Sequence, residues 1–393
     1  MGARDMSGEA ILTINAGSSS IKFSVYAAGA EPVELGRGEV ENLNAEAHLQ
    51  VEPAGGPASD EQIGKADHAQ ALRAILDHLA PILEGRHVAG VGHRVVHGGV
   101  KYAAPQILDD QVVEDLHALE PLAPLHQPYN LAAVNAARAA FPDALQLACF
   151  DTGFHRGHSW VNETFALPRA YYDRGIRRYG FHGLSYEFIA GEIARRYPEL
   201  AGGRAIVAHL GNGASMCAMQ AGRSVTTTMG LSALDGLPMG TRTGQIDPGV
   251  LLYLMEFEGM DAAALTRLLY KESGLKGLSG ISNDMRTLEA SDAPEAAQAI
   301  AYFTARIRHE IGALTADLGG LDALVFTGGI GEHSVRVRAG ACNGMGWLGL
   351  SVDAGANAKG APEIGAGRVR VLVIPTDEER VIARAVAGVL AQG

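Results

Sequence analysis

The amino-acid sequence predicts an α/β protein built from two similar halves. At Ile11–Tyr26 an apolar run stops at a turn of small polar residues, and apolar and polar side chains then alternate, which indicates a strand, a tight turn and a second strand. The same pattern returns at Ala205–Met219 around a Gly-Asn-Gly turn. With 393 residues and 47% hydrophobic content, the chain is long enough for two domains. Two such hairpins about half a chain apart indicate an internal duplication.

The first hairpin also suggests a ligand. Ser20, Lys22 and Ser24 share one face of the second strand, so a turn rich in N–H and O–H donors ends beside an ammonium group, an arrangement that suits phosphate. The alternative is an ordinary hairpin with a polar outer face. The recurrence of the pattern favours the phosphate site, and one nucleotide held between two such halves is the simplest use of the pair.

Composition excludes several classes of partner. The formal net charge is −12 and the sequence contains no run of Lys or Arg, which argues against nucleic acid or an anionic membrane surface as partner. The first residues lack an apolar targeting segment, and no apolar run approaches membrane-spanning length. The three cysteines are scattered, so we expect reduced structural thiols in a cytoplasmic protein.

Periodicity predicts the elements that follow the first hairpin. Alternation favours a third strand at 33–40, and the polar segment 52–60, which contains Gly and Pro, is expected to be irregular. A helix is predicted at 67–83, because Leu72, Ile75, Leu76 and Leu79 recur at helical spacing.

The next elements bring charged side chains to strand ends. A short strand at 88–96 delivers His93, Arg94 and His97 to its carboxyl end. Two helices follow, separated by a rigid loop with several prolines, and then a strand that places Asp151 at its carboxyl end; the helices are expected at 109–119 and 131–140, the loop at 121–128 and the strand at 145–150. Ligands collect at the carboxyl ends of strands in α/β sheets.

The second half begins after a crossover. The polar, aromatic segment 152–179 suits a connection between halves, and a helix is expected at 186–197. A third strand at 223–229 follows the second hairpin. The loop 230–247 carries four glycines and one proline, so specific contacts are needed to hold it, and such loops are more often functional than structural.

The remaining elements complete the second half. We expect helices at 250–258, 261–272 and 294–318, with the segment 280–286 between the last two. A buried strand is expected at 321–326, ending in a Gly-rich segment, followed by a strand at 369–374 and a helix at 377–390.

Common chemical motifs are absent from the sequence. It contains no GxxxxGK[ST], no GxGxxG beside a strand, no HExxH and no paired CxxC, which argues against P-loop, Rossmann and protein-kinase sites. The pairs His93/His97 and His155/His158 have spacings found in metal sites, but neither has a third ligand in sequence, so a structural zinc site is disfavoured.

Nine motifs in order carry a resemblance to a known family. They are INAGSSSIK, GHRVVHGG, PLAPLHQP, FDTGFH, RRYGFHG, HLGNGAS, MGTRTGQIDPG, TGGIGE and PTDEE, and they extend from about residue 10 to residue 380. In this order they closely resemble acetate kinases. Each motif alone is weak evidence, whereas nine in order are highly specific.

The resemblance implies a fold and its domains. Acetate kinases belong to the actin-like, sugar-kinase-like phosphotransferases, so it implies an α/β fold of duplicated actin-like (ribonuclease H-like) βββαβαβα domains with an interdomain cleft. We expect residues 10–152 with 380–393 to form an N-terminal domain that holds the acid and phosphoryl site. Residues 153–379 are expected to form a C-terminal domain that holds the nucleotide site.

The resemblance also implies ATP and ADP as co-substrates. Residues of four segments match the family's nucleotide site. They are Ser18, Ser20 and Lys22 in the first segment, His209, Leu210, Gly211, Asn212 and Gly213 in the second, Asp284, Met285 and Arg286 in the third, and Gly329, Ile330, Gly331, Glu332 and His333 in the fourth.

For the acid, the resemblance assigns Arg94 and Arg242 to gripping acetate and the transferring phosphoryl group, and His182 to donating to that group. Forked cations stabilise the charge on the equatorial oxygens of a loose phosphoryl transition state. Surface salt bridges are the alternative for these arginines. The residues matched to the acid site are Lys22, Val96, Leu125, His126, Phe181 and Ala233.

A carboxylate substrate has a pKa near ~4, so it is already ionised at neutral pH and needs no catalytic base. Asp151 is therefore expected to position acetate and Mg²⁺ rather than to abstract a proton. By resemblance, Asn15 and Glu378 lie near Mg²⁺, with Mn²⁺ as an alternative ion. Thr376 to Glu379 read as a capping box in which Glu379 is engaged and Glu378 is left for the metal.

Three positions depart from the family pattern. PTDEE replaces the usual PTNEE, so Asp377 adds a carboxylate beside the expected metal. His333 stands where an amide is common near the adenosine. Ala233 replaces a proline of the acid pocket, which favours some tolerance of propionate.

The favoured hypothesis is a cytoplasmic, homodimeric acetate kinase that forms acetyl phosphate and ADP from acetate and ATP by direct in-line attack. A propionate or other short-chain acyl kinase is the alternative within the class. A non-catalytic actin-like scaffold is a third hypothesis, and the presence of Arg94, His182 and Arg242 argues against it, since a scaffold needs none of them.

Overall fold

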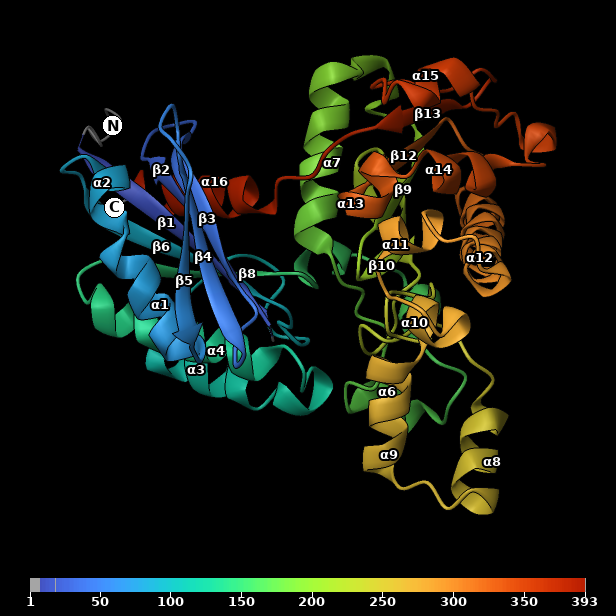
Figure 1. Cartoon of the computed structure of the whole chain (residues 1–393), viewed down its shortest axis with the longest axis horizontal. Helices are drawn as coiled ribbons and strands as arrows, with labels where there is room; N and C mark the ends of the chain where they lie inside the picture. The colour runs from blue at the N-terminus through green and yellow to red at the C-terminus, as the bar shows by residue number, and fades with distance from the viewer. Residues whose placement is uncertain (1–7, 18, 393) are drawn as a thin grey trace. The chain divides into compact units, whose positions relative to one another are not determined.

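The computed structural model describes residues 8–17 and 19–392, and the described chain forms two compact units. Unit 1 comprises the chain up to Gly153 and again from Asp377, and unit 2 is Phe154–Thr376. Figure 1 shows the elements of each unit along the colour gradient. The chain therefore passes from one unit to the other at two places, after Gly153 and after Thr376.

The described part of unit 1 contains an eight-stranded sheet in the order β5-β4-β3-β2-β1-β6-β8-β7. Strands β1 to β5 pair antiparallel in succession, whereas β6 pairs parallel with β1 and β8 pairs parallel with β6. The strands are β1 (Glu9–Ala16), β2 (Ile21–Ala27), β3 (Val33–Glu41), β4 (Glu46–Pro53), β5 (Ser59–Lys65), β6 (His87–Val95), β7 (Gln106–Ile107) and β8 (Leu145–Phe150).

The helices of unit 1 include one from the far end of the sequence. They are α1 (His68–Asp77), α2 (Leu79–Leu83), α3 (Asp110–His117), the short 3₁₀ turn η1 (Glu120–Leu122), α4 (Gln127–Ala140) and α16 (Glu378–Leu390). Helix α16 packs against β1 and β6, and in Figure 1 this red helix lies with the blue strands of unit 1. Glycines make the close approach possible: a Cβ on Gly92 of β6 would lie 2.3 Å from Cγ2 of Ile382.

Unit 2 contains a five-stranded sheet, described in the order β11-β10-β9-β12-β13. Its strands are β9 (Arg204–Leu210), β10 (Ala214–Gln220), β11 (Arg223–Thr227), β12 (Ala323–Thr327) and β13 (Arg370–Val373). Its helices are α5 (Trp160–Glu163), α6 (Arg169–Asp173), α7 (Gly183–Arg196), α8 (Pro248–Phe257), α9 (Ala262–Arg267), α10 (Gly274–Ser279), α11 (Met285–Glu289), α12 (Pro294–Leu318), α13 (Gly328–His333), α14 (Val335–Cys342) and α15 (Ala354–Ala358). Single turns of other helix types are η2 (Gly153–His155, which begins at the last residue of unit 1), η3 (Pro198–Leu200), η4 (Leu268–Glu272) and η5 (Gly346–Leu348).

The two sheets share a topology. In each unit an antiparallel three-stranded meander opens the sheet, its first strand then pairs parallel with a fourth strand, and the fourth pairs parallel with a fifth. The order β3-β2-β1-β6-β8 thus corresponds to β11-β10-β9-β12-β13. The predicted α/β fold with duplicated domains is confirmed.

The expectation of an irregular segment at 52–60 is wrong. Strands β4 and β5 form a hairpin there, and Gly55 turns the chain with φ of 77° between them. Along β4 the buried Ala47, Leu49 and Val51 alternate with more exposed residues, which is the pattern of a strand that covers a core on one face. The pairing of β4 with β5 was not predicted, because β5 is polar and lacks the apolar alternation of a half-buried strand.

Several helix boundaries also differ. The helix expected at 67–83 is interrupted at His78, which ends α1 and precedes α2. Helix α4 begins at Gln127 rather than at residue 131, because Pro128 lies in its first turn, where proline is tolerated.

The capping box expected at Thr376 is wrong as well. Asp377 is the N-cap of α16, and its carboxylate accepts a hydrogen bond from the backbone N–H of Arg380. Asp377 also accepts a bond from Nε of Arg380 at 2.8 Å. The extra carboxylate of the PTDEE motif is therefore engaged within its own helix. Thr376 donates instead to Oγ of Ser185.

The three cysteines are free and buried, as the sequence predicts for structural thiols. None of the helices in the described ranges has the length and apolar character that a membrane span requires.

Candidate active site

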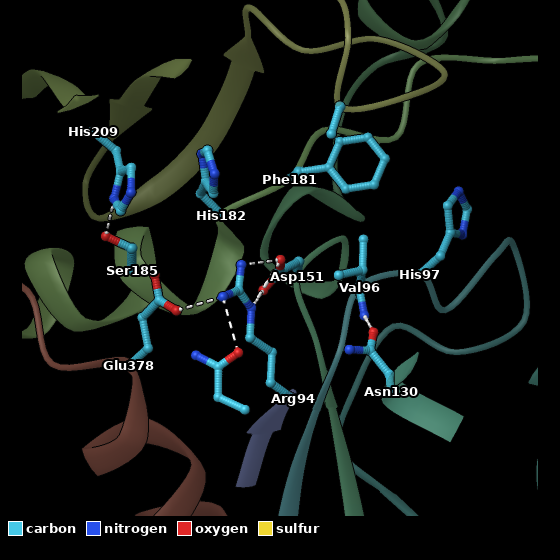
Figure 2. A network of polar contacts seen from close by, with 12 residues as sticks. Arg94, Val96, His97, Asn130, Asp151, Phe181, His182, Ser185, His209 and Glu378 are labelled. Atoms are coloured by element: carbon cyan, nitrogen blue, oxygen red, sulfur yellow. Dashed lines mark hydrogen bonds and ion pairs between the residues drawn. The ribbon is translucent and has the colours of Figure 1, made fainter. Parts of the chain in front are cut away.

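In unit 1, Arg94 and Asp151 lie at the adjacent carboxyl ends of two parallel strands. Arg94 pairs in register with Cys149, so Asp151, two residues beyond, lies beside the arginine. Nε of Arg94 donates to Oδ1 of Asp151 at 2.9 Å and Nη2 donates to Oδ2 at 2.7 Å (Figure 2). The pair is a bidentate fork, and Asp151 is only 1% exposed.

The other end of the same guanidinium meets the two residues expected near the metal. Nη1 of Arg94 donates to Oδ1 of Asn15 at 3.3 Å and lies 3.2 Å from Oε2 of Glu378. Asn15 in turn donates to Oε1 of Glu379 at 3.3 Å. Thus Asn15, Arg94, Asp151 and Glu378 converge, and Glu379 contacts Asn15 instead of closing a capping box.

Burial and charge shift the pKa values of this cluster. Burial raises the pKa of Glu378, although the charge of Arg94 opposes the shift. Burial also raises the pKa of Glu379, and the neighbouring Glu378 adds to that shift. Burial opposes the charge of Arg94, but Asp151 and Glu378 outweigh it and raise its pKa. The carboxylates of Asp151, Glu378 and Glu379 all act on the guanidinium of Arg94, so in their ionised forms they carry more negative charge than this one group can balance.

The residues expected in the acid site fall into two groups. In unit 1, Val96 follows β6 and is buried, and Leu125 and His126 are half-buried in the loop before α4. Gln127 ties this loop to the strand end, since its amide contacts both the N–H and the C=O of His97. The other group, Phe181 and Ala233, belongs to unit 2.

Asn130 of α4 is a residue that the sequence analysis missed. Its Oδ1 accepts from the N–H of Val96 at 3.0 Å (Figure 2). Its Nδ2 donates to the carbonyl of Ala16 at 2.6 Å. It therefore fixes the ends of β6 and β1 together. The signal was a buried polar residue on the apolar face of an amphipathic helix.

In unit 2, His182 and Arg242 approach the same glycine. A Cβ built on Gly213 would lie 3.2 Å from Nε2 of His182 and 3.8 Å from Nη1 of Arg242. Nη1 of Arg242 donates to the carbonyl of Ala233 at 3.0 Å. The structure therefore brings together four residues that the sequence spreads over about sixty positions, two of them expected to bind the phosphoryl group.

His182 is held in an uncommon conformation. It precedes α7 with φ of 58° and ψ of 24°, in the left-handed region that non-glycine residues rarely adopt. Its Nδ1 lies 2.8 Å from Oγ of the buried Ser215, and its ring stacks on His209 at 4.3 Å. Nδ1 of His209 lies 2.8 Å from Oγ of Ser185 (Figure 2). Ser215 also escaped the sequence analysis.

A pocket of about 530 Å³ in unit 2 collects three of the segments expected to bind the nucleotide. The predicted residues that line it are Gly211, Asn212, Asp284, Met285, Arg286, Gly329, Ile330 and His333. The sequence analysis missed the lining residues Asn283, Glu289 and Ser334.

Other predicted nucleotide residues do not line this pocket. Leu210 is buried in the core, and Glu332 accepts a hydrogen bond from the N–H of Gly328 at 2.9 Å. His209, Gly213 and Gly331 are likewise outside its lining. Arg338, which the sequence did not indicate, supports α13 by donating to the carbonyls of Gly331 and Glu332 at 2.9 and 2.7 Å.

In the first hairpin Lys22 is exposed but Ser24 is buried, and the ammonium group of Lys22 is paired. Nζ of Lys22 lies 3.6 Å from Oε2 of Glu39, its cross-strand neighbour. The carbonyl of Ser20 accepts from the N–H of Gly17 and closes the turn. The predicted residue Ser18 lies outside the described residues.

The histidine pairs considered for zinc are engaged in hydrogen bonds instead. Nε2 of His93 lies 2.8 Å from Oε1 of Gln146, and both His155 and His158 contact Ser224. Among the residues that the structure describes, no group of three or more His, Cys, Asp or Glu side chains is arranged to hold a metal ion.

Comparison with known proteins gives consistent matches along nearly the whole chain. Residues 10–384 match the model of the Acetokinase family. A curated acetate kinase of Methylocella silvestris is 52% identical over 97% of this chain and 98% of its own length. The crystal structure of Porphyromonas gingivalis acetate kinase is 35% identical with a TM-score of 0.87, covering 97% of this chain and 100% of that chain. A propionate kinase structure from Francisella tularensis is 32% identical with a TM-score of 0.89, covering 96% and 98%.

Proposed function

This chain belongs to the acetokinase family, and on that premise we propose that it catalyses reversible in-line transfer of the γ-phosphoryl group of ATP to acetate, giving acetyl phosphate and ADP. It is a kinase whose acceptor is a carboxylate. The residue roles below are part of the same proposal.

The observation that carries the proposal is the pocket in unit 2. Three segments that are far apart in the sequence converge on one concave surface: the β9–β10 turn around Gly211, the start of α11 at Asp284 and helix α13 around Gly329. Backbone N–H groups of Gly-rich turns suit phosphates, and the neighbouring polar side chains suit a nucleoside. ATP or ADP would bind there.

The Arg94–Asp151 fork serves the acid. Both oxygens of Asp151 already accept hydrogen bonds from Arg94, which suits a positioning group better than a proton acceptor. Because the acid is ionised at neutral pH, no base is required. Arg94 would bind the acid and the transferring group, and Val96, Leu125 and His126 of unit 1, with Lys22, are its proposed neighbours, together with Phe181 and Ala233 of unit 2.

His182 and Arg242 serve the transferring phosphoryl group. Their approach to Gly213 puts an imidazole and a guanidinium next to a backbone that a side chain would obstruct. Donors held in place before the reaction stabilise developing charge most effectively. Ser18, Ser20 and Lys22 would contact the phosphates from the first hairpin.

The donor set around Arg94 fits a hard divalent cation. Asn15 and Glu378 offer the amide and carboxylate oxygens that Mg²⁺ prefers, and the buried carboxylates exceed the single guanidinium in charge. When bound, Mg²⁺, or Mn²⁺ in its place, supplies positive charge that offsets the charge of the phosphate oxygens.

The proposal extends to assembly and location. The exposed apolar side chains of α8 support a homodimer, since isolated surface helices rarely show so many: Val250, Leu252, Tyr253, Met255 and Phe257. Free, buried cysteines support a cytoplasmic location.

Trapping of the acyl phosphate as its hydroxamate tests the function. The purified protein is incubated with ATP, MgCl₂ and acetate, propionate or butyrate in parallel, with Arg94→Ala as the inactive control. We expect acetate to give the highest kcat/KM, propionate a measurable value and butyrate a poor one. Absence of hydroxamate above the Arg94→Ala background with all three acids would contradict the proposal.

A propionate kinase is the second candidate, favoured by the Francisella tularensis structure and by Ala233, which is smaller than the proline usual in the family. One methylene is worth roughly 1–3 kcal/mol in such a pocket, so discrimination should be modest.

Val96→Ala tests where the acid binds. Val96 is buried beside the Arg94 strand end, so its truncation should enlarge the pocket and raise kcat/KM for propionate relative to acetate. Val95→Ala, at the preceding residue and packed in the core, is the matched control. A preference for propionate in the wild type, or an unchanged ratio in Val96→Ala, would show that this placement is wrong.

A further inference from the structure

His155 lies at the centre of a buried polar network in unit 2. Its side chain is fully buried, with Nδ1 2.8 Å from Oγ of Ser224 and Nε2 3.0 Å from the carbonyl oxygen of Phe181. Two further groups contact the same hydroxyl: Nε2 of His158 at 2.7 Å and Sγ of Cys217 at 3.2 Å. Every heteroatom of the His155 ring therefore has a defined partner.

These contacts fix the position of each proton. A carbonyl oxygen only accepts, so Nε2 of His155 carries the hydrogen that bonds to Phe181. Burial lowers the pKa of His155 to about 3, so the ring is neutral and Nδ1 is an acceptor. Ser224 must therefore donate its single O–H to Nδ1.

The rest of the network agrees with this assignment. Since the Ser224 hydrogen is used, His158 has to donate to its oxygen, whereas the thiol of Cys217 can donate either to Ser224 or to the carbonyl of Ala218, which lies 3.6 Å from Sγ. Burial lowers the pKa of His158 to about 4 and raises the pKa of Cys217 to about 12, so the first is neutral with hydrogen on Nε2 and the second is a protonated thiol. The serine gives one hydrogen bond to His155 and receives one from His158, and no neutral ring with hydrogen on Nδ1 of His155 satisfies the carbonyl of Phe181.

The carbonyl that His155 holds belongs to the peptide that enters His182. A peptide unit is planar, so fixing the direction of the Phe181 carbonyl also fixes the N–H of His182. Helix α7, which begins at Gly183, holds the chain on the other side of the His182 Cα, so the φ angle of His182 is set between two fixed parts. That angle is 58°, in the left-handed region where a non-glycine residue persists only if its surroundings impose it. The hydrogen bond from His155 is one such constraint.

The packing of the ring against the preceding residue is a second constraint. Gly180 has φ of 75°, and a Cβ there would lie 2.6 Å from Cδ2 of His155 and 2.5 Å from Cγ2 of Thr227. The imidazole thus lies directly against the backbone of Gly180 and bonds to the next residue. His155 contacts the segment 180–182 both sterically and through a directional bond.

We infer that His155 is a positioning residue for the phosphoryl-transfer reaction: as a neutral imidazole with hydrogen on Nε2, it holds the Phe181–His182 peptide so that the His182 ring faces the reacting group. The inference rests on the proposed role of His182. Ser224 sets the tautomer, and His158 sets the orientation of the Ser224 hydroxyl. His155 itself is fully buried and leaves no surface for contact with the substrate.

Paired substitutions test whether turnover depends on the Nε2–H group of His155. His155→Leu removes the donor, and kcat should fall roughly 10²-fold because the His182 ring loses its alignment. KM for ATP and acetate should stay within about threefold, since ground-state binding is retained. His155→Gln keeps an N–H near the position of Nε2 and should restore most of kcat. His309→Leu, on the exposed face of α12, is the control and should behave as wild type.

A double-mutant cycle shows whether His155 acts through His182. In a His182→Ala background, His155→Leu should lower kcat no further. If the two losses multiply, or if His155→Leu keeps wild-type kcat, the inference is overturned. His182→Ala alone reports on the proposed function: if that variant retains wild-type turnover, the role of His182 fails, and the failure is visible without reference to His155.

A spectroscopic measurement keeps the test decisive if His155→Leu does not fold. Long-range ¹H–¹⁵N correlation spectra of ¹⁵N-histidine-labelled wild-type protein report the tautomer of each ring. A neutral ring with hydrogen on Nε2 is expected for His155 throughout pH 6–8, and Ser224→Ala should change its signals and those of His182. Hydrogen on Nδ1, or a charged ring in that range, would overturn the inference.

Discussion

Arg94 is surrounded by more negative charge than it carries, and this decides what its removal does. Its guanidinium makes a fork with Asp151 and also contacts Glu378. Removing one partner of a buried pair leaves the remaining charge uncompensated, which costs about 3–5 kcal/mol. Arg94 should therefore matter for stability as well as for the reaction.

Arg94→Ala and Arg242→Ala should each lower kcat by roughly 10³-fold or more, because a forked cation stabilises the charge of the phosphoryl transition state. Lys at either position should not restore activity, since it lacks the fork. Hydroxamate formation measures turnover, and circular dichroism at a temperature below each midpoint confirms folding. Turnover of a folded variant within about fivefold of wild type would refute the role.

Glu378 gives a pH dependence that can be measured without substrate. Burial raises its pKa in the folded protein, so its contribution to stability is present at pH below about 4.5 and is lost as pH rises through the raised value. Glu378→Gln cannot ionise and should melt at a higher temperature than wild type at pH 8 in EDTA. MgCl₂ should raise the midpoint of wild type more than that of the variant. The exposed Glu114→Gln is the control; a lower midpoint for Glu378→Gln in EDTA would mean that its pairing with Arg94 outweighs burial.

Helix α16 illustrates how one element depends on the absence of side chains in another. Gly90 and Gly92 of β6 leave room for Val386 and Ile382 of the helix. Since α16 also carries Glu378 in its first turn, the depth at which the helix packs sets the position of a carboxylate beside Arg94.

Gly92→Ala should destabilise the protein by about 1–3 kcal/mol, because its Cβ would overlap Ile382. Gly191→Ala is the matched control: it lies inside α7, where an added Cβ meets nothing within 4 Å, so it should stabilise by about 0.5–1 kcal/mol. Urea midpoints measure both. Equal effects of the two substitutions would contradict the packing argument.

At the level of elements, the sequence predicted what local patterns encode. The two hairpins and the placement of Arg94 and Asp151 at strand ends followed from alternation and apolar runs. The roles of Asn130 and Ser215 did not, since each bonds a residue more than thirty positions away in sequence and depends on strand register and helix packing. The β4–β5 hairpin was missed because β5 buries little and its composition resembles a loop.

The whole molecule has to bring both units to the same substrates. The proposed phosphoryl-binding residues are divided, with Arg94 in unit 1 and His182 and Arg242 in unit 2, and the nucleotide pocket belongs to unit 2. Direct transfer requires reacting atoms about 3–3.5 Å apart and exclusion of competing water.

Small-angle scattering should therefore show a smaller radius of gyration with ADP, Mg²⁺, acetate and a planar anion that mimics the phosphoryl group than without ligands. The Arg94→Ala protein with the same ligands is the control and should change less. An unchanged radius for the fully loaded wild type would count against closure as part of turnover.

The return of the C-terminal helix α16 to unit 1 has a consequence for folding during synthesis. After β8 the chain leaves unit 1 and forms all of unit 2, and after β13 it returns to unit 1 as α16. When the first 153 residues have emerged from the ribosome, α16, the helix that packs on β1 and β6, has not yet been synthesised. Synthesis of unit 1 therefore begins first and ends last. Its apolar sheet face stays uncovered while the ribosome synthesises the whole of unit 2, at a translation rate of ~5–20 residues per second. A nascent chain arrested before residue 377 should hence be a better ligand for chaperones than the released enzyme, even though it contains all of unit 2.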